Sequence, residues 1–254
     1  MLDPVQRDRL LVVLVSPRNP LNIGASARAM ANFGFSHLAV VSPYAPHWRE
    51  ARSAVGAPQL LQSAVECATL TEALADCTLV AGTGTLTRRK PEQQVVPLPA
   101  LGPVIRGEIA RGGRAALVFG PEKRGLTRDD LSRCHLLVEI PTAPEQPSMN
   151  LGQAVAVCLY ELTARAHDLD RAVPYHSADH PSPGPKDRPA TSATLDLLAG
   201  VIDEAMQAAD YSPLEMRLAN QHDMRLLVRR LSLTERDARR ILGLFRRILR
   251  RLKR

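Results

Sequence analysis

Three polar side chains stand at positions of this 254-residue sequence where they could act on a substrate. Glu122 follows a Gly-Pro turn, Asn150 lies in the first turn of an otherwise apolar stretch, and Arg28 lies early in a helix of small residues. A carboxylate and an amide orient polar groups, and a guanidinium binds anions and stabilises developing negative charge. Each residue also has an ordinary interpretation, as a solvated turn carboxylate, a second helix cap and a surface arginine.

The elements around Glu122 and Asn150 must place both residues at the ends of strands. Residues 117–119 and 136–140 are mostly apolar, and Gly-Pro or Pro follows each run, which predicts two short buried strands. Thr127, with an aspartate three residues later, predicts the capped start of a short helix. Ser148 is predicted to cap a helix that runs to about residue 167. In an open parallel sheet, ligands bind outside the carboxyl ends of the strands.

The preceding chain continues the same alternation of strand and helix. Strands are predicted at residues 10–15, 37–41 and 78–81, and helices at residues 22–34, 48–76 and 98–111. Alternation from residue 10 to 167 predicts an α/β fold with a parallel sheet. The strand at 78–81 leads into Gly82-Thr83-Gly84-Thr85 and a loop with Arg88, Arg89 and Lys90. A G-x-G pair alone is only a weak indication of phosphate or nucleoside binding.

The composition changes after this α/β region. We predict a domain over residues 1–167, a Pro-rich linker over 168–191 and a helical tail over 192–254. In the tail, Thr234 is predicted to cap a last helix with Ile241, Phe245, Ile248, Leu249 and Leu252 inside. Residues 217–254 carry 13 Lys or Arg against three acidic residues, a net charge of +10, whereas residues 1–216 carry 20 against 23. A concentrated positive charge predicts a polyanionic partner.

Other features limit the class of protein. No apolar run approaches the ~20 residues of a membrane span, and the first apolar run is too short for a signal peptide, so we expect a cytoplasmic protein without membrane contact. The four cysteines stand singly in apolar surroundings, which predicts free buried thiols. His176 and His180 lack a third ligand, so no metal is expected.

Three sequence blocks resemble the motifs of a known family. They read N-x-G-x-x-x-R at 22–28, F-G-x-E-x-x-G-L at 119–126 and S-M-N-L at 148–151. In this order they resemble the SpoU/TrmH-like branch of the SPOUT RNA methyltransferases. Met149 in place of a usual Leu and Gly152 in place of a common Ala are small departures. The linker and basic tail resemble the TrmJ type, whose members 2′-O-methylate the ribose at position 32 of the tRNA anticodon loop, on cytidine or uridine.

The resemblance implies a fold, a cofactor and a site. It implies a C-terminal trefoil knot in the sheet domain, an exception to unknotted connections, and a homodimer. It implies S-adenosyl-L-methionine as cofactor and tRNA as substrate. By position in the motifs, the catalytic residues are Arg28, Asn22, Glu122 and Asn150, with Arg28 completing the site across the dimer interface. The matching cofactor residues are Thr83, Gly84, Thr85, Gly120, Ile140, Ser148, Met149 and Asn150.

Physical chemistry favours particular roles within that site. A guanidinium is effectively never neutral in a protein, so Arg28 is better suited to hold a phosphate and stabilise an alkoxide than to act as a base. Glu122 is expected to orient an arginine, and Asn150 the substrate or the motif backbone. Two alternatives remain, the same chemistry on ribosomal RNA and a non-catalytic RNA-binding protein. A dinucleotide enzyme would require G-x-G-x-x-G after the first strand, where this chain has S-P-R-N-P-L-N-I-G.

Overall fold

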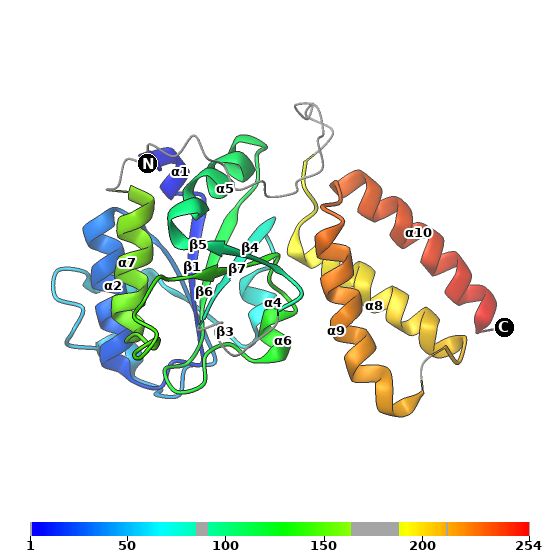
Figure 1. The fold of residues 1–254 in the computed structure, drawn as a ribbon, viewed down its shortest axis with the longest axis horizontal. Coiled ribbons are helices and arrows are strands. Elements are labelled where there is room, and N and C mark those ends of the chain that lie inside the picture. Colours follow the sequence, from blue (N-terminus) through cyan, green and yellow to red (C-terminus); the bar gives the residue numbers. More distant parts are fainter. Residues whose placement is uncertain (1, 85–90, 164–187, 212, 254) are drawn as a thin grey trace.

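The structure, a computed structural model, describes residues 2–84, 91–163, 188–211 and 213–253. One sheet of seven parallel strands forms the centre of the fold, in the order β3-β2-β1-β6-β4-β7-β5 (Figure 1). The parallel α/β sheet predicted from the sequence is therefore confirmed. Its strands are β1 (Leu10–Val15), β2 (His37–Val41), β3 (Val65–Cys67), β4 (Leu79–Thr83), β5 (Gln94–Pro97), β6 (Ala115–Phe119) and β7 (Leu136–Glu139).

The central strands are apolar along their whole length. Every residue of β1, β4 and β6 is buried, and alternate residues of β1 belong to two separate core clusters, one on each face of the sheet. A parallel sheet with continuous apolar strands has to be covered by helices on both faces. The register aligns Leu14 with Phe119 and Thr83 with Val138, so neighbouring strands end together at the carboxyl edge.

Longer helices cover one face of the sheet. They are α2 (Pro20–Phe33), α5 (Leu98–Ala110) and α7 (Leu151–Thr163), and α3 (Pro58–Ser63) lies on the same core cluster. Helix α2 ends at Gly34, whose φ of 73° is the left-handed conformation that favours glycine. The other face carries the short helices α4 (Leu70–Ala73) and α6 (Arg128–Leu131), and α6 begins with the predicted capping box of Thr127 and Asp130. A single helical turn, α1 (Pro4–Arg7), precedes β1.

The helical prediction for residues 48–76 is largely wrong. This region contains the 3-10 turn η1 (Trp48–Glu50), then α3, the strand β3 and α4, which Thr69 caps. Gly56, with a φ of 79°, and Pro58 break the helical path before α3. The strands β3 and β5 were both missed, because each is a short strand at an edge of the sheet and lacks a long apolar run.

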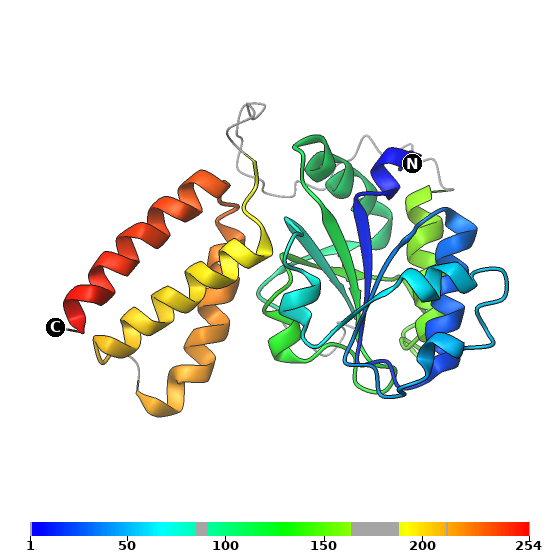
Figure 2. The same cartoon turned by 180° about the vertical axis from the view of Figure 1, so that it is seen from behind.

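Three longer helices follow residue 188 and lie beside the sheet (Figures 1 and 2). They are α8 (Ser192–Ala208), α9 (Arg217–Arg230) and α10 (Glu235–Leu252), with the short turn η2 (Leu214–Met216) before α9. Thr234 caps α10 as predicted. Ile248 and Leu252 were predicted inside but are 39% and 42% exposed, because α10 packs on α8 along a stripe narrower than its apolar face. Most of the predicted linker, with His176 and His180, lies outside the described residues.

The C-terminal helices are bonded directly to the sheet unit. The amide of Ser192 donates to the carbonyl of Cys77 at 2.8 Å. The guanidinium of Arg229, a residue only 2% exposed, donates to the carbonyl of Arg133 at 3.0 Å and to the carboxylate of Asp196 at 2.8 Å. A buried arginine that reaches both units holds α8 and α9 in one orientation relative to the sheet.

Candidate functional site

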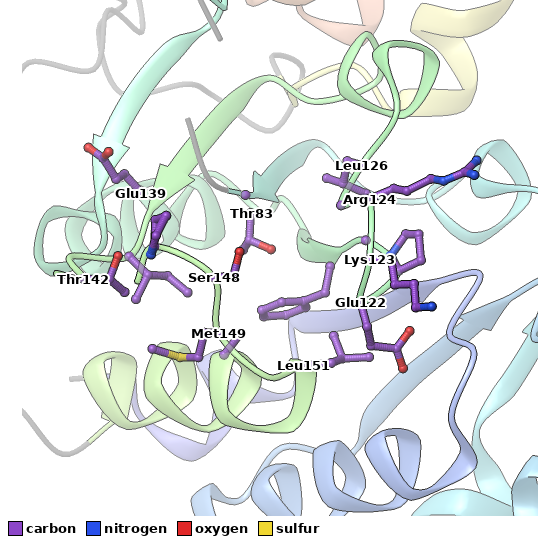
Figure 3. A pocket seen from close by; sticks show the side chains of 18 residues that line it. Thr83, Glu122, Lys123, Arg124, Leu126, Glu139, Thr142, Ser148, Met149 and Leu151 are labelled. Atoms are coloured by element: carbon purple, nitrogen blue, oxygen red, sulfur yellow. The ribbon is translucent and has the colours of Figure 1, made fainter. Parts of the chain in front are cut away.

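A cavity of about 250 Å³ lies at the carboxyl ends of β4, β6 and β7. These three strands are neighbours in the sheet, although they are far apart in sequence. Figure 3 shows Thr83 at the end of β4, Glu122 in the loop after β6, and Ser148 and Met149 in the loop before α7, around the space. Of the predicted cofactor residues, those that line the cavity are Thr83, Gly84, Gly120, Ile140, Ser148 and Met149. Thr85, Arg88, Arg89 and Lys90 lie outside the described residues.

Two glycines at the cavity have opposite surroundings. A Cβ atom added to Gly120 would lie 2.3 Å from main-chain atoms of both Gly125 and Leu126, so the loop after β6 folds back on itself there and accepts only glycine. A Cβ atom added to Gly84 would meet no atom of the described residues within 4 Å. Gly120 therefore shapes the wall of the cavity, whereas Gly84 borders open space.

Glu122 is held at the rim of the cavity by the loop between β1 and α2. Its carboxylate accepts a hydrogen bond from Asn22 Nδ2 at 2.8 Å and from the main-chain amides of Arg18 and Asn19 at 3.1 and 3.2 Å. Burial acts to raise the pKa of Glu122, but these hydrogen bonds outweigh it and lower the pKa. Glu122 is thus an ionised carboxylate that fixes one loop to another. The expectation that it orients an arginine side chain stays a prediction.

Asn150 joins the third loop to the other two. Its Nδ2 donates to Asn22 Oδ1 at 3.0 Å, and its Oδ1 accepts from the amides of Gly152 and Gln153 at 2.9 and 3.4 Å. Asn150 and not Ser148 therefore caps α7, which begins at Leu151 and not at Met149 as predicted. Its side chain is shared between the cap and a continuous chain of hydrogen bonds, Glu122–Asn22–Asn150, which we call the Asn22 network.

The backbones of α2 and α7 approach each other closely beside this network. A Cβ atom added to Gly152 would lie 2.7 Å from the Cβ atom of Ala25, and one added to Gly24 would lie 2.2 Å from Ser53 Oγ. The small residues of α2 thus permit close packing. Close packing brings the first turns of both helices together, which is the condition for the contact between Asn22 and Asn150.

Arg28 lies apart from the Asn22 network. It is exposed on α2, and it is not among the described residues that line the cavity. The structure brings Asn22, Glu122 and Asn150 together within one chain, and it presents Arg28 to solvent on an outer helix. An exposed arginine in this place is available to a second molecule, either RNA or another copy of the chain.

Charged residues that the sequence reasoning passed over also line the cavity. They are Lys123, Arg124 and Glu139, and Thr142 lies on the side of Glu139 (Figure 3). Lys123 and Arg124 follow Glu122 directly, and a run of two cations in a loop at a strand end was a usable signal. Within the described residues, no group of three or more His, Cys, Asp or Glu side chains is arranged to hold a metal ion. The described helices include none long and apolar enough to cross a membrane.

Known proteins are similar to this chain over about three fifths to two thirds of its length. A tRNA (cytidine/uridine/adenosine-2′-O-)-methyltransferase TrmJ from Pseudomonas aeruginosa is 42% identical over 161 residues, which cover 61% of this chain and 60% of that protein. The match thus spans about three fifths of that relative's length. A tRNA (cytidine/uridine-2′-O-)-methyltransferase TrmJ from Klebsiella pneumoniae is 38% identical over 179 residues, with coverages of 67% and 71%.

Solved structures give the same result for the fold. The crystal structure of TrmJ from Z. mobilis ZM4 has a TM-score of 0.79 and 27% identity, and covers 94% of this chain and 98% of its own. A probable methyltransferase from Bordetella pertussis Tohama I has a TM-score of 0.58 and 30% identity, with coverages of 63% and 97%. The family model for the SpoU rRNA Methylase family matches residues 9–160, which contain the whole cavity and the Asn22 network. The chain belongs to the SpoU methylase family.

Proposed function

We propose that this protein is an S-adenosylmethionine-dependent RNA ribose 2′-O-methyltransferase that acts on tRNA, at cytidine or uridine 32 of the anticodon loop. The observation that carries the proposal is the Asn22 network, which ties the three motif segments together beside one cavity. The names of the relatives from Pseudomonas and Klebsiella, both tRNA 2′-O-methyltransferases, support the reaction and the substrate class. Since tRNA is a cytoplasmic substrate, the cytoplasm is the proposed location.

The cavity fits the proposed cofactor. Main-chain groups at the ends of three adjacent strands surround it, and such groups can recognise an adenine without dedicated side chains. Open space above Gly84 leaves room for a ligand, and Ile140 and Met149 supply apolar walls. When bound, the cofactor supplies a methyl group that an oxygen nucleophile can accept. The residues proposed to hold it are Thr83, Gly84, Thr85, Gly120, Ile140, Ser148, Met149 and Asn150.

The chain's own residues have to position and activate a ribose. A 2′-hydroxyl is a weak nucleophile, so the rate depends on alignment and on stabilising the negative charge that develops on the oxygen. Arg28 is proposed to hold the adjacent phosphate and to stabilise that charge, since its guanidinium stays protonated. Glu122, Asn22 and Asn150 are proposed to keep the loops of the site in register while the substrate binds.

The exposed position of Arg28 favours a homodimer in which each site borrows Arg28 from the partner subunit. Apolar residues are exposed on the same outer helices, with Leu21 on α2 54% exposed and Val157 and Tyr160 on α7 38% and 50% exposed. A second copy seated on α2 and α7 would cover these residues and carry its own Arg28 towards the site. The dimer is therefore part of the proposed mechanism.

The trefoil knot is also proposed for this chain. Helix α7 packs on α2, on the β1 side of the sheet, whereas β7, which precedes α7, lies next to the opposite edge. The segment between β7 and α7 has to cross the carboxyl edge of the sheet, and it lines the same cavity as the loop after β6. A crossing beside that loop is the path that threading requires.

The positively charged α10 is proposed as an additional RNA contact. Its outer surface carries exposed arginines, including Arg246, Arg247 and Arg250. Arginines on one rigid helix can contact phosphates of an A-form RNA, and such contacts position the RNA without reading its bases.

Methyl transfer to separated RNA pools tests the proposed function. The full chain, supplied with cofactor carrying a labelled methyl group, is expected to label tRNA, and nuclease mapping is expected to place the label on the ribose at position 32. The family model is described as an rRNA methylase, which makes ribosomal RNA the second candidate. Label on ribosomal RNA alone would establish that alternative, and label on neither pool would contradict both.

A further inference from the structure

An exposed aromatic residue stands next to the site and has no place in the proposed chemistry. Tyr44, in the loop after β2, is 73% exposed. The guanidinium carbon of Arg18, in the loop after β1, lies over its ring at 5.3 Å from the centroid. One face of the ring is therefore covered by a cation, which is a favourable stacking partner. The large exposed fraction leaves the rest of the ring open to solvent.

The same loop that carries Arg18 also holds Glu122. The main-chain amide of Arg18 donates to Glu122 Oε2 at 3.1 Å, while its side chain extends to Tyr44. The amide of Tyr44 in turn donates to the carbonyl of Pro17 at 3.1 Å. Tyr44 is thus connected to the Asn22 network through two consecutive residues, and the Arg18–Tyr44 pair lies at the rim of the site.

Both loops leave their strands through a strained serine. Ser16 after β1 and Ser42 after β2 have φ values of 45° and 44°, in the left-handed region that side chains rarely adopt. Both are locked by hydrogen bonds, from the amide of Ser16 to Val41 at 2.7 Å and from Ser42 Oγ to Ala68 at 2.7 Å. Such conformations persist only where the surroundings hold them, so the two loops are held in fixed positions.

We infer that the Arg18–Tyr44 pair is a stacking platform for an unpaired nucleobase that neighbours the methylated nucleotide. Unpaired RNA bases stack on tyrosine rings and on arginine planes, and this contact tolerates any base because every base has a π-face. An anticodon loop supplies unpaired bases on both sides of its target ribose. The inference rests on the proposed function and adds to it a residue pair that positions the RNA.

Binding to tRNA transcripts that carry one abasic nucleotide in the anticodon loop tests the platform. With the full wild-type chain, one abasic position is expected to weaken binding roughly five- to a hundred-fold, the range for a lost base–aromatic stack. Tyr44→Ala is expected to weaken binding of intact tRNA by a similar factor, and to show no further loss with that abasic tRNA. Tyr44→Phe and Tyr44→Trp are expected to bind nearly as the wild type does, because stacking needs the ring and not the hydroxyl.

Two further readouts separate stacking from other effects. Tyr44→Ala is expected to keep the salt dependence of binding, since no phosphate contact is lost. Tyr211, which is 71% exposed in the turn after α8, supplies a matched control, and Tyr211→Ala is expected to leave the response to the abasic series unchanged. Unchanged thermal unfolding of each variant checks that it folds.

The outcomes distinguish this inference from the proposed function. If the wild-type chain methylates tRNA and Tyr44→Ala binds and methylates it equally well, the platform is wrong and the function stands. The platform is also wrong if Tyr44→Ala and every abasic position cause independent, additive losses. A wild-type chain that neither binds nor methylates tRNA overturns the proposed function, and the platform with it.

Discussion

Asn22 is the residue on which the arrangement of the site depends. Its amide uses both ends, since Nδ2 donates to Glu122 and Oδ1 accepts from Asn150. A side chain with only acceptors cannot do this, because it would face the Glu122 carboxylate without a proton to donate. Asn22 is thus required because its amide supplies a donor to one partner and an acceptor to the other, and not because of the size of its side chain.

Replacing Asn22 by aspartate therefore tests the network with almost no change of shape. Asn22→Asp removes the hydrogen bond that Asn22 donates to the charged Glu122, and it places two carboxylates together. Loss of the hydrogen bond alone costs about 1.5–3 kcal/mol. We expect methyl transfer at neutral pH to fall at least tenfold. Gln153→Glu adds the same charge at an exposed position of α7 and should leave the rate nearly unchanged. Equal rates in both variants would show that the network has no role in the reaction.

Arg28 is expected to carry the chemistry without binding the cofactor. Arg28→Ala should lower methyl transfer by roughly two to three orders of magnitude, as the loss of a group that stabilises charge does, and leave cofactor affinity unchanged in a calorimetric titration. Arg28→Lys should also lower methyl transfer, because a lysine cannot make the bidentate contact of an arginine. Arg52→Ala, at an exposed position outside the motifs, is the control. Near-normal turnover of either Arg28 variant would refute this role.

At the scale of elements, the loop after β6 and the end of β4 form opposite parts of one cavity. Gly120 has no room for a methyl group, since its Cβ would lie 2.3 Å from main-chain atoms, whereas a Cβ on Gly84 would meet no atom of the described residues within 4 Å. The two positions differ in packing and share a residue type. They therefore allow the structural role of a glycine to be separated from its role towards a ligand.

The matched pair Gly120→Ala and Gly84→Ala makes that separation measurable. Gly120→Ala should lower the free energy of unfolding by about 1–3 kcal/mol, because the loop backbone has to move. Gly84→Ala should unfold at the same denaturant concentration as the wild type and bind S-adenosylmethionine more weakly, because the added methyl group occupies the open space. A Gly84→Ala chain that unfolds early, or binds the cofactor as the wild type does, would contradict this assignment.

At the scale of the whole molecule, ion pairs connect the C-terminal helices to the part of the chain that contains the sheet. Asp129 of α6 accepts from Arg225 of α9 at 2.6 Å and from Arg133 at 3.2 Å. Burial acts to raise the pKa of Asp129, but these arginines outweigh it and hold the pKa below its usual range. The helices α8 and α9 are thus docked, so removing residues 192–254 would expose the sheet unit as well as delete charge. Point changes on α10 are the cleaner test.

Neutralising three exposed arginines of α10 tests its contact with RNA. The triple change of Arg246, Arg247 and Arg250 to Gln should weaken tRNA binding and lower the slope of log affinity against log salt by roughly 0.7–0.9 for each lost phosphate contact. The triple change to Lys keeps the charge and should keep the slope. If the Gln variant binds with the wild-type slope, α10 has a structural role, and RNA capture belongs to the sheet unit.

The shared site of the proposed dimer is tested by mixing two inactive variants. Arg28→Ala lacks one half of each site and Asn150→Ala the other. If Arg28 acts across the interface, half of the randomly mixed dimers contain one intact site. Roughly a quarter of the wild-type activity should then return after refolding the two together. No return of activity, with both variants still dimeric by sedimentation, would place Arg28 and Asn150 in the same subunit's site.

Local sequence patterns were enough to predict the parallel α/β fold, most helices and strands, and the family. Those properties follow from local signals, such as the apolar runs of β1 and β6, the caps Thr127 and Thr234, and motif blocks that need no knowledge of contacts. The edge strands β3 and β5 were not predicted, because their pairing with a neighbouring strand, and not a pattern in their own residues, defines them.

The contacts between the motif residues follow from tertiary packing and not from local sequence patterns. Glu122 could have been a solvated carboxylate and Asn150 a simple cap. The packing of Gly152 against Ala25 brings α7 onto α2, and the Asn22 amide then joins both residues. Likewise no local pattern pairs Arg18 with Tyr44, because strands β1 and β2 become neighbours only in the sheet. Contacts between distant segments depend on the packing of whole elements, so they cannot be predicted from a residue's neighbours in sequence.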